Sequence, residues 1–309
     1  MPQDNIFNRI AISQVPRIIG FIDCDEQSKT YGCCDRHYWH YKTVDISNAR
    51  YQEAALTLAC AYSLNHLDNP YFHHKDLKSL VSAIGNFWFK RVHHDGSVDE
   101  SYPQEHHFCA TALSLFSLTE SLLILDEKSK NDFDRSIKFL SKNNNLKVSN
   151  QTAGSAAALY NIYLLTGSDI ARLAAEEKIA YLLKQQEKEE FFTEYGGFDL
   201  GYNSITLSFL ALLFKKTGRD DIKCAAIRAI DYMRPFLDEN GYYSPDAMSR
   251  NTQFLYPYGL SVFASDVLAQ LKQGLERGVV LNPTWLDDRY CIPLTNDYLL
   301  SSLYPQEEK

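Results

Sequence analysis

Apolar residues recur at three- and four-residue steps along most of this 309-residue chain. The first such stripe consists of Ala54, Ala55, Leu58, Ala59 and Tyr62. The next consists of Leu77, Leu80, Val81, Ile84, Phe87 and Trp88. This spacing is that of one buried face of an α-helix, so both stripes are predicted helices. Residues 1–48 have turn formers and isolated aromatic residues but no sustained period, and we expect them to be irregular.

The remaining helices are predicted to follow one another in pairs. The pairs are 108–126 with 131–142, 152–166 with 169–187, 203–217 with 220–237, and 257–276 with a short helix near 297–303. Thr166-Gly-Ser-Asp and Thr217-Gly-Arg-Asp have the same form, a glycine after a helix end and then a polar N-cap. Two turns of one form indicate an internal repeat of helix pairs.

The two helices of a pair differ in composition. The first helix of each pair, as in Ala110–Leu118, Ala153–Leu159 and Ile205–Leu213, has few charges, whereas its partner has the Lys, Glu and Asp residues. A helix that is apolar all round is buried, and a one-sided helix faces water. We therefore expect an all-α fold, a single (α/α) toroid of five or six hairpins over residues 49–309. The irregular segment 1–48 would pack on its mouth.

Two short motifs resemble those of known toroid families. Asp95-Gly-Ser97, followed by Thr111-Ala-Leu113, resembles the squalene-cyclase and prenyltransferase repeat. Tyr195-Gly-Gly-Phe-Asp-Leu-Gly-Tyr202 resembles the turns of heparinase II/III-type polysaccharide lyases. The resemblance covers residues 50–275 and implies an α/α toroid.

The unusual residues of the chain lie in the loops that precede the apolar helices. These loops are 95–107, 149–154, 194–203 and 239–259, and the helices after them are expected to begin near Cys109, Ala153, Ser204 and Tyr258. In a toroid all of these loops emerge at one end. Their backbone N–H groups and the helix dipoles would then converge at a mouth that favours anions.

Acids and bases are concentrated in two of the loops. The candidate catalytic residues are His106, His107, Tyr102, Tyr202, Glu100, Glu105, Glu194 and Asp199. Imidazole, phenol and carboxyl groups are the usual general acids and bases near neutral pH. The alternative is that the two histidines only cap the next helix, and that the glycines around Asp199 form a tight turn.

Polar and aromatic side chains that could grip a sugar occur in the same loops and in the N-terminal segment. The candidate substrate-binding residues are Asn150, Gln151, Arg250, Asn251, Asn203, Tyr195, Trp39, His40, Asp35, Arg36 and Tyr256. Arg250 is suited to a bidentate contact with a carboxylate, and tyrosine offers an apolar face with a polar tip. The alternative for Arg250 is a structural ion pair.

Composition excludes several classes of function. The net charge of −8 with scattered basic residues argues against nucleic acid. The N-terminus does not resemble a signal peptide, no apolar run is long enough to span a membrane, and seven irregularly spaced cysteines favour a reducing compartment. We therefore predict a cytoplasmic protein. Without a P-loop, GxGxxG, GxSxG, CxxC or HExxH motif, neither a cofactor nor a metal is expected.

Three functions remain open at this point. The first is cleavage of an acidic, uronate-containing oligo- or polysaccharide. Elimination would use His106 or His107 as base and Tyr202 or Tyr102 as acid, and hydrolysis would use two of the loop carboxylates. The second is a cyclase-like or prenyl-binding toroid, for which Asp23-Cys-Asp-Glu26 and Asp287-Asp288 are not expected to begin an inner helix. The third is a non-catalytic ligand-binding toroid.

Overall fold

The computed structural model describes residues 5–129, 131–243, 246 and 248–304, and in these ranges the fold is all-helical with only isolated β-bridges. The α-helices are α1 (Ile6–Ile19), α2 (Arg36–Trp39), α3 (Ala54–Ser63), α4 (Lys75–Phe89), α5 (Phe108–Ile124), α6 (Asp134–Lys142), α7 (Ser149–Thr166), α8 (Asp169–Glu189), α9 (Leu200–Thr217), α10 (Asp220–Met233), α11 (Pro257–Phe263), α12 (Ser265–Glu276) and α13 (Asp288–Leu303). Short 3-10 helices are η1 (Ala49–Glu53), η2 (Arg234–Phe236) and η3 (Pro283–Trp285).

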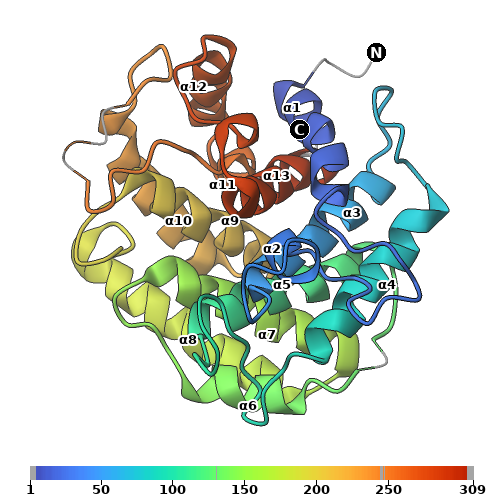
Figure 1. The fold of residues 1–309 in the computed structure, drawn as a ribbon. Helices are drawn as coiled ribbons and strands as arrows, with labels where there is room; N and C mark the ends of the chain where they lie inside the picture. Colours follow the sequence, from blue (N-terminus) through green and yellow to red (C-terminus); the bar gives the residue numbers. More distant parts are fainter. Residues whose placement is uncertain (1–4, 130, 244–245, 247, 305–309) are drawn as a thin grey trace.

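The helices pack in a closed cycle. Helix α3 contacts α5, and the contacts continue in the order α7, α9, α11 and α13, after which α13 returns to α3. A second set packs outside them: α1 contacts α13, α4 contacts α3, α8 contacts α7, α10 contacts α9, and α12 contacts α11. In Figure 1 the helices of the cycle lie toward the middle and most of the second set lie around the rim. We call the first set the central helices.

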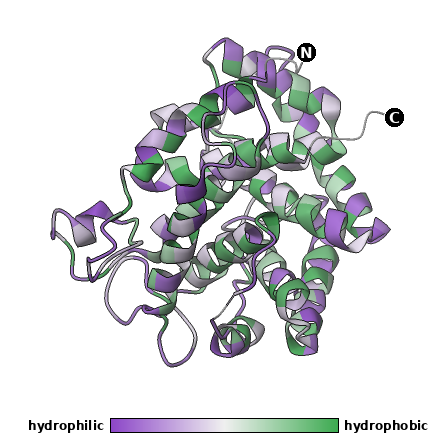
Figure 2. Cartoon of the chain, turned by 90° about the vertical axis from the view of Figure 1, so that its right-hand side faces the viewer, coloured by the Kyte–Doolittle hydropathy of each residue, from purple (hydrophilic) through white to green (hydrophobic). Residues whose placement is uncertain are grey.

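Burial follows the difference in composition between the two sets. Every residue of α5 from Cys109 to Ser121 is buried, whereas α10 buries one face only. Figure 2 shows hydrophobic positions along the helices and hydrophilic ones along many of the loops. Close packing also requires small residues: a Cβ on Gly154 of α7 would stand 2.3 Å from a methyl carbon of Leu113. In the described part of the chain, none of the helices has the length and apolar character that crossing a membrane requires.

The expectation that residues 1–48 are irregular is wrong for the first part of this segment. Residues Ile6–Ile19 form α1, and the Asn5 side chain caps it by accepting a hydrogen bond from the Phe7 N–H. The buried stripe is Phe7, Ala11, Val15 and Ile18. The turn formers of this segment include Gly20, and Pro16 lies inside the helix. Pro16, however, lies in the last turn, where its missing N–H costs one intrahelical bond, and Gly20 only ends the helix.

The C-terminal helices also differ from the prediction. The expected single helix 257–276 is two helices, because Ala264 has φ −151° and ψ 78°, which is not helical. The pair α11–α12 is thus a complete hairpin. The expected short helix near 297–303 is the end of α13, which begins at Asp288 and has Asp287 as its N-cap. Helices α7 and α9 likewise begin three residues before the predicted ranges 152–166 and 203–217, at Ser149 and Leu200.

Candidate functional site

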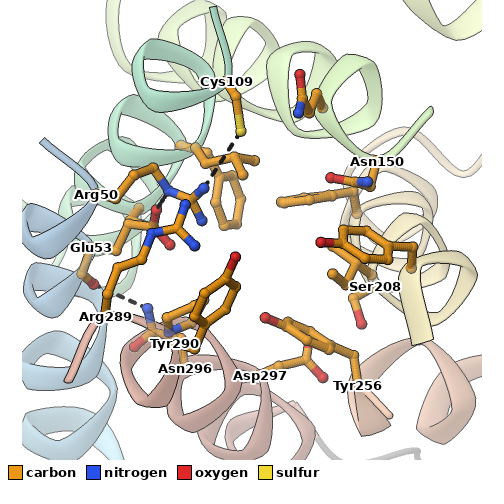
Figure 3. Close-up of a pocket in the computed structure, with 18 of the residues that line it drawn as sticks. Arg50, Glu53, Cys109, Asn150, Ser208, Tyr256, Arg289, Tyr290, Asn296 and Asp297 are labelled. Atoms are coloured by element: carbon orange, nitrogen blue, oxygen red, sulfur yellow. Dashed lines mark hydrogen bonds and ion pairs between the residues drawn. The ribbon is translucent and has the colours of Figure 1, made fainter. Parts of the chain in front are cut away.

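A cavity of about 350 Å³ opens where the central helices begin. Each central helix, or the segment before it, contributes to the lining. Figure 3 shows the labelled side chains pointing toward one open space from different helices. We describe three parts of this lining: a cationic side, an aromatic side and a floor.

The cationic side consists of Arg50, Glu53, Glu100, His107 and Arg289. Arg50 forms a buried ion pair with Glu53, and Arg289 pairs with Glu100. The Nδ1 atom of His107 lies 2.9 Å from Oε2 of Glu100. The same nitrogen is also placed to accept a longer hydrogen bond, 3.4 Å, from the Ala110 N–H, since His107 is the N-cap of α5. We assign the Nδ1 proton to the shorter contact with Glu100, which leaves Nε2 of His107 with a free lone pair.

The pKa values on this side follow from burial and charge together. Burial alone would raise the pKa of Glu100, but the hydrogen bond from His107 and the charges of Arg50 and Arg289 outweigh it and lower the pKa to about 2. Glu100 is therefore a carboxylate throughout the physiological range. Cys109, whose Sγ accepts from Arg50 at 3.4 Å, has its pKa raised to about 11 by burial. Its thiol is therefore protonated and unsuited to act as a nucleophile.

The aromatic side consists of Tyr195, Tyr202, Phe254, Tyr256 and Arg250. The ring centroids of Tyr195 and Tyr202 are 5.7 Å apart, those of Tyr202 and Phe254 are 6.1 Å apart, and those of Phe254 and Tyr256 are 5.8 Å apart. The guanidinium of Arg250 lies 4.3 Å from the Tyr195 centroid. Burial raises the pKa of Tyr202 to about 12, so its phenol keeps its proton at neutral pH.

The floor contains buried polar groups. Asp297 of α13 accepts a 2.7 Å hydrogen bond from the Tyr258 N–H and is also bonded by Ser208 of α9. Burial outweighs these bonds and raises the pKa of Asp297 to about 7. Beside it, Asn296 is held by Thr57 and by the backbone oxygen of Glu53. A carboxyl group that titrates near neutrality can give or take a proton there.

One helical turn beyond Ser117 of α5 and Leu212 of α9, which line the cavity, a layer of polar side chains joins three of the central helices. Glu120 of α5 is fully buried and is bonded by Lys216 of α9 and, at 2.8 Å, by Nδ2 of Asn161 of α7. Lys216 also donates to Asn161 at 2.6 Å. We call Glu120, Asn161 and Lys216 the axial polar layer.

Many of the predicted site residues meet at this cavity. The structure places nine of them in its lining: Glu100, Glu105, His107, Asn150, Gln151, Tyr195, Tyr202, Arg250 and Tyr256. Asn150 and Gln151 lie on the first turn of α7 and Tyr202 on that of α9, where the prediction had loops. Helix N-termini present these side chains at the opening.

Three predicted residues lie behind the lining and hold it in place. Glu194 is fully buried and accepts from both the backbone N–H and Nδ2 of Asn150, at 2.8 and 2.7 Å. Burial raises its pKa well above the ordinary range despite these bonds. Asp199 caps α9 and accepts from the N–H of Arg250 at 3.1 Å. Asn203 is bonded to the backbone of Phe192. The structure thus places Glu194, Asp199 and Asn203 outside the lining, bonded to backbone and amide groups of the segments that carry it.

The other predicted residues lie away from the cavity. His106 is bonded to Ser97 and Asp95, and Tyr102 is largely exposed. Asn251, in the left-handed backbone region, also lies outside the lining.

The four candidates from the N-terminal segment organise α2. Asp35 caps α2, and Arg36 pairs with Asp288 at the start of α13. Trp39 donates to the backbone oxygen of Phe21, while His40 is exposed and lies against Trp39. These contacts dock α2 near the first turn of α13 without bringing its side chains into the lining.

Sequence reasoning missed much of the cationic side and the floor. The missed polar residues are Arg50, Glu53, Cys109, Ser208, Arg289, Tyr290, Asn296 and Asp297. A usable signal was the spacing of Arg289, Asn296 and Asp297, which puts polar groups on one face of α13. The expectation that Asp287-Asp288 does not begin an inner helix is wrong, because these residues open α13. They bond to the helix start and to Arg17 and Arg36, outside the lining.

Among the residues that the structure describes, no group of three or more His, Cys, Asp and Glu side chains is arranged to hold a metal ion. All seven cysteines are free thiols. Comparison with known protein families, curated proteins and solved structures found no match to this chain.

Proposed function

We propose that this protein is an enzyme that cleaves a uronate-containing oligo- or polysaccharide in the cavity described above, by β-elimination. The observation that supports this most is the pairing of His107 with the ionised Glu100, opposite a row of tyrosines and Arg250. A histidine oriented by a carboxylate is a general base, and the aromatic side offers faces for a sugar ring.

We further propose that the closed cycle of central helices, with its outer partners, is an α/α toroid of six hairpins. The cyclic contacts and the complete α11–α12 hairpin support this reading. It agrees with the resemblance of residues 195–202 to turns of heparinase II/III-type lyases. The cytoplasmic location stays a prediction from the sequence.

Each step of the elimination has a candidate group in the lining. Arg250, with Asn150 and Gln151, binds the sugar carboxylate and withdraws charge, which acidifies the proton on the adjacent carbon. Nε2 of His107 removes that proton. Tyr202, protonated at neutral pH, donates a proton to the departing glycosidic oxygen as the double bond forms. Glu194 holds the Asn150 amide in place.

Hydrolysis is the second candidate, because the floor contains Asp297 with its pKa raised to about 7. Hydrolases of the two-carboxyl type need one carboxylic acid that remains protonated near neutrality and a second, ionised carboxylate. Asp297 and Glu100 have these two protonation states. In this mechanism Asp297 protonates the leaving oxygen and the product has no double bond.

The test is to incubate the protein with oligosaccharides from alginate, pectate and uronate-bearing glycosaminoglycans. Ultraviolet absorbance reports the unsaturated product of elimination, and reducing-end release reports cleavage of either kind. His107→Ala is expected to lower the rate of absorbance increase by about 10²–10⁴-fold, the usual contribution of a general base. Arg250→Ala is expected chiefly to raise KM for the acidic chain.

Matched controls lie outside the cavity. His40→Ala removes an exposed imidazole and Arg172→Ala a half-buried guanidinium on α8 that pairs with Asp169 and Glu176, and neither is expected to change the rate. Release of reducing ends without an increase in ultraviolet absorbance would support hydrolysis. In that case the Asp297→Asn variant should release no reducing ends. Binding without turnover would select the ligand-binding toroid. If none of these oligosaccharides is bound or cleaved, the proposal is refuted and the cyclase-like function is favoured.

A further inference from the structure

The cavity has a closed inner end. Its lining descends α5 through Leu113, Phe116 and Ser117, and the next residue on that helix face is Glu120. It descends α9 through Ser208 and Leu212, and the residue one turn further is Lys216. Residues three or four apart share a helix face, so Glu120 and Lys216 follow the lining on the same faces of α5 and α9, and their side chains meet there.

The axial polar layer fills that position with bonded side chains. Glu120 and Asn161 are both fully buried, and Lys216 joins them from a third helix. Between them they connect α5, α7 and α9. The lining of the cavity includes Ser117 and Leu212 but none of the three residues of this layer, so it ends before the layer on the side of α5, α7 and α9. The starts of the central helices form its other end.

The dimensions of the cavity fit a short ligand. From His107 to Ser117 the lining of α5 rises roughly 15 Å, at 1.5 Å per residue. The volume of about 350 Å³ lies near the lower end of the range for small-molecule sites, about 300–1,000 Å³. We call this cavity, with its inner end at the floor, the well. An internal stretch of a polymer would have to enter and leave the well through one opening, whereas the end of a chain can enter it directly.

The polarity of the well also favours a terminal sugar. Ser208, Asn296 and Asp297 offer hydroxyl, amide and carboxyl groups at the floor, all at least nine-tenths buried. These groups can bond the free hydroxyls of a last sugar unit. His107 and Arg289 stand at the starts of α5 and α13, and with Arg250 they line the cavity nearer the opening, where the carboxylate of an acidic unit would stand. We propose that the well admits only the end of an acidic glycan chain, so that the enzyme removes terminal units. This inference depends on the proposed function.

The test uses one uronate hexasaccharide that binds or is cleaved, in four forms: free, with a fluorescein-sized group on the reducing end, on the non-reducing end, and on both. Binding is measured calorimetrically, and early products are sized by mass spectrometry. Arg250→Ala identifies binding in this cavity, with Arg172→Ala as the control of equal charge change. We expect early products to be one- or two-unit fragments plus the shortened remainder. The doubly capped chain should bind at least about 100-fold more weakly than the free chain.

Early products cut from the middle of the chain would overturn the inference, and so would a doubly capped chain that binds as well as the free one. Either result would leave the proposed function intact, because cleavage or Arg250-dependent binding would still be seen. If no acidic chain binds in an Arg250-dependent manner, the proposed function and this inference both fail.

Discussion

At the scale of single residues, two buried carboxyl groups in one cavity have pKa shifts of opposite sign. Glu100 has a histidine and two arginines near it, and its pKa falls to about 2. Asp297 has only the Tyr258 N–H and the Ser208 hydroxyl, and burial raises its pKa to about 7. The number of cationic partners therefore decides which carboxyl group is ionised.

The raised pKa of Asp297 predicts a specific pH dependence of stability. Between its ordinary pKa of 3.8 and about 7, the folded state binds more protons than the unfolded state, so the free energy of unfolding falls as pH rises. The loss amounts to up to about 4 kcal/mol across this window. Asp297→Asn cannot titrate and is expected to lack this loss. Denaturant unfolding at pH 5 and pH 8 measures the difference.

Two comparisons make this prediction specific. The effect of Glu100 has the opposite sign, because its stabilisation is lost only as pH falls from its ordinary pKa of 4.5 toward 2, below the range of the measurement. Asp169→Asn, at an exposed position on α8, should keep the wild-type pH dependence. An Asp297→Asn variant with an unchanged slope between pH 5 and pH 8 would contradict the assignment.

At the scale of elements, the aromatic side depends on how residues 250–256 dock against the first turn of α9. Asp199 caps that turn and accepts from the N–H of Arg250 and from Thr252. Gly201 permits the close approach: a Cβ there would stand 2.3 Å from Oγ1 of Thr252 and 2.7 Å from the backbone oxygen of Phe254. The glycine thus sets the position of Arg250 and Phe254.

Gly201→Ala is therefore expected to displace this segment, with a loss of about 1–3 kcal/mol of stability. Affinity for an acidic ligand should fall as well, because Arg250 moves. Gly85→Ala in α4 is the matched control. A Cβ at Gly85 meets nothing within 4 Å, so this change should stabilise the helix by about 0.5–1 kcal/mol. Thermal unfolding and ligand titration of both variants decide the matter; equal stabilities would refute the docking argument.

The elements also show what the sequence could predict. The glycine stops after α7 and α9 are confirmed, since Gly167 and Gly218 have φ of 74° and 67°. Ser168 caps α8 as predicted, but the Arg219 side chain does not cap α10. The loop residues of the site were predictable because their polarity has no packing role. The spacing of Arg289 and Asp297 could place both on one face of α13, but the sequence did not show that this face meets the loops of the site, because the contacts are between segments far apart in the chain.

At the scale of the whole molecule, α1 and the axial polar layer connect helices that are far apart in the sequence. Phe7 of α1 packs edge-on against Tyr298 of α13, with ring centroids 5.1 Å apart. The N-terminal helix therefore covers the last helix of the cycle, and the sequence missed this because the partner lies almost the whole chain away. The axial polar layer connects α5, α7 and α9 at the opposite end from the opening.

Breaking the axial polar layer should cost more than an ordinary surface change. Lys216→Ala leaves the fully buried Glu120 carboxylate without its cation, for an expected loss of about 3–5 kcal/mol of stability. The double variant Glu120→Leu, Lys216→Met should recover most of that loss. Lys215→Ala, at the adjacent exposed position, is the control. The free energy of unfolding is measured by chemical denaturation. Equal values for Lys216→Ala and Lys215→Ala would show that the axial polar layer does not stabilise the fold.

The axial polar layer has a further consequence for solvent. The lining of the cavity ends before Glu120, Asn161 and Lys216, so we expect an arriving ligand and the water that it displaces to use the same opening in opposite directions. Ligand and water then occupy the floor in turn. After one ligand molecule leaves, water fills the well, and the next ligand molecule displaces that water. The hydration of Asp297 and Ser208 therefore alternates with occupancy, and each binding event includes the cost of drying those groups.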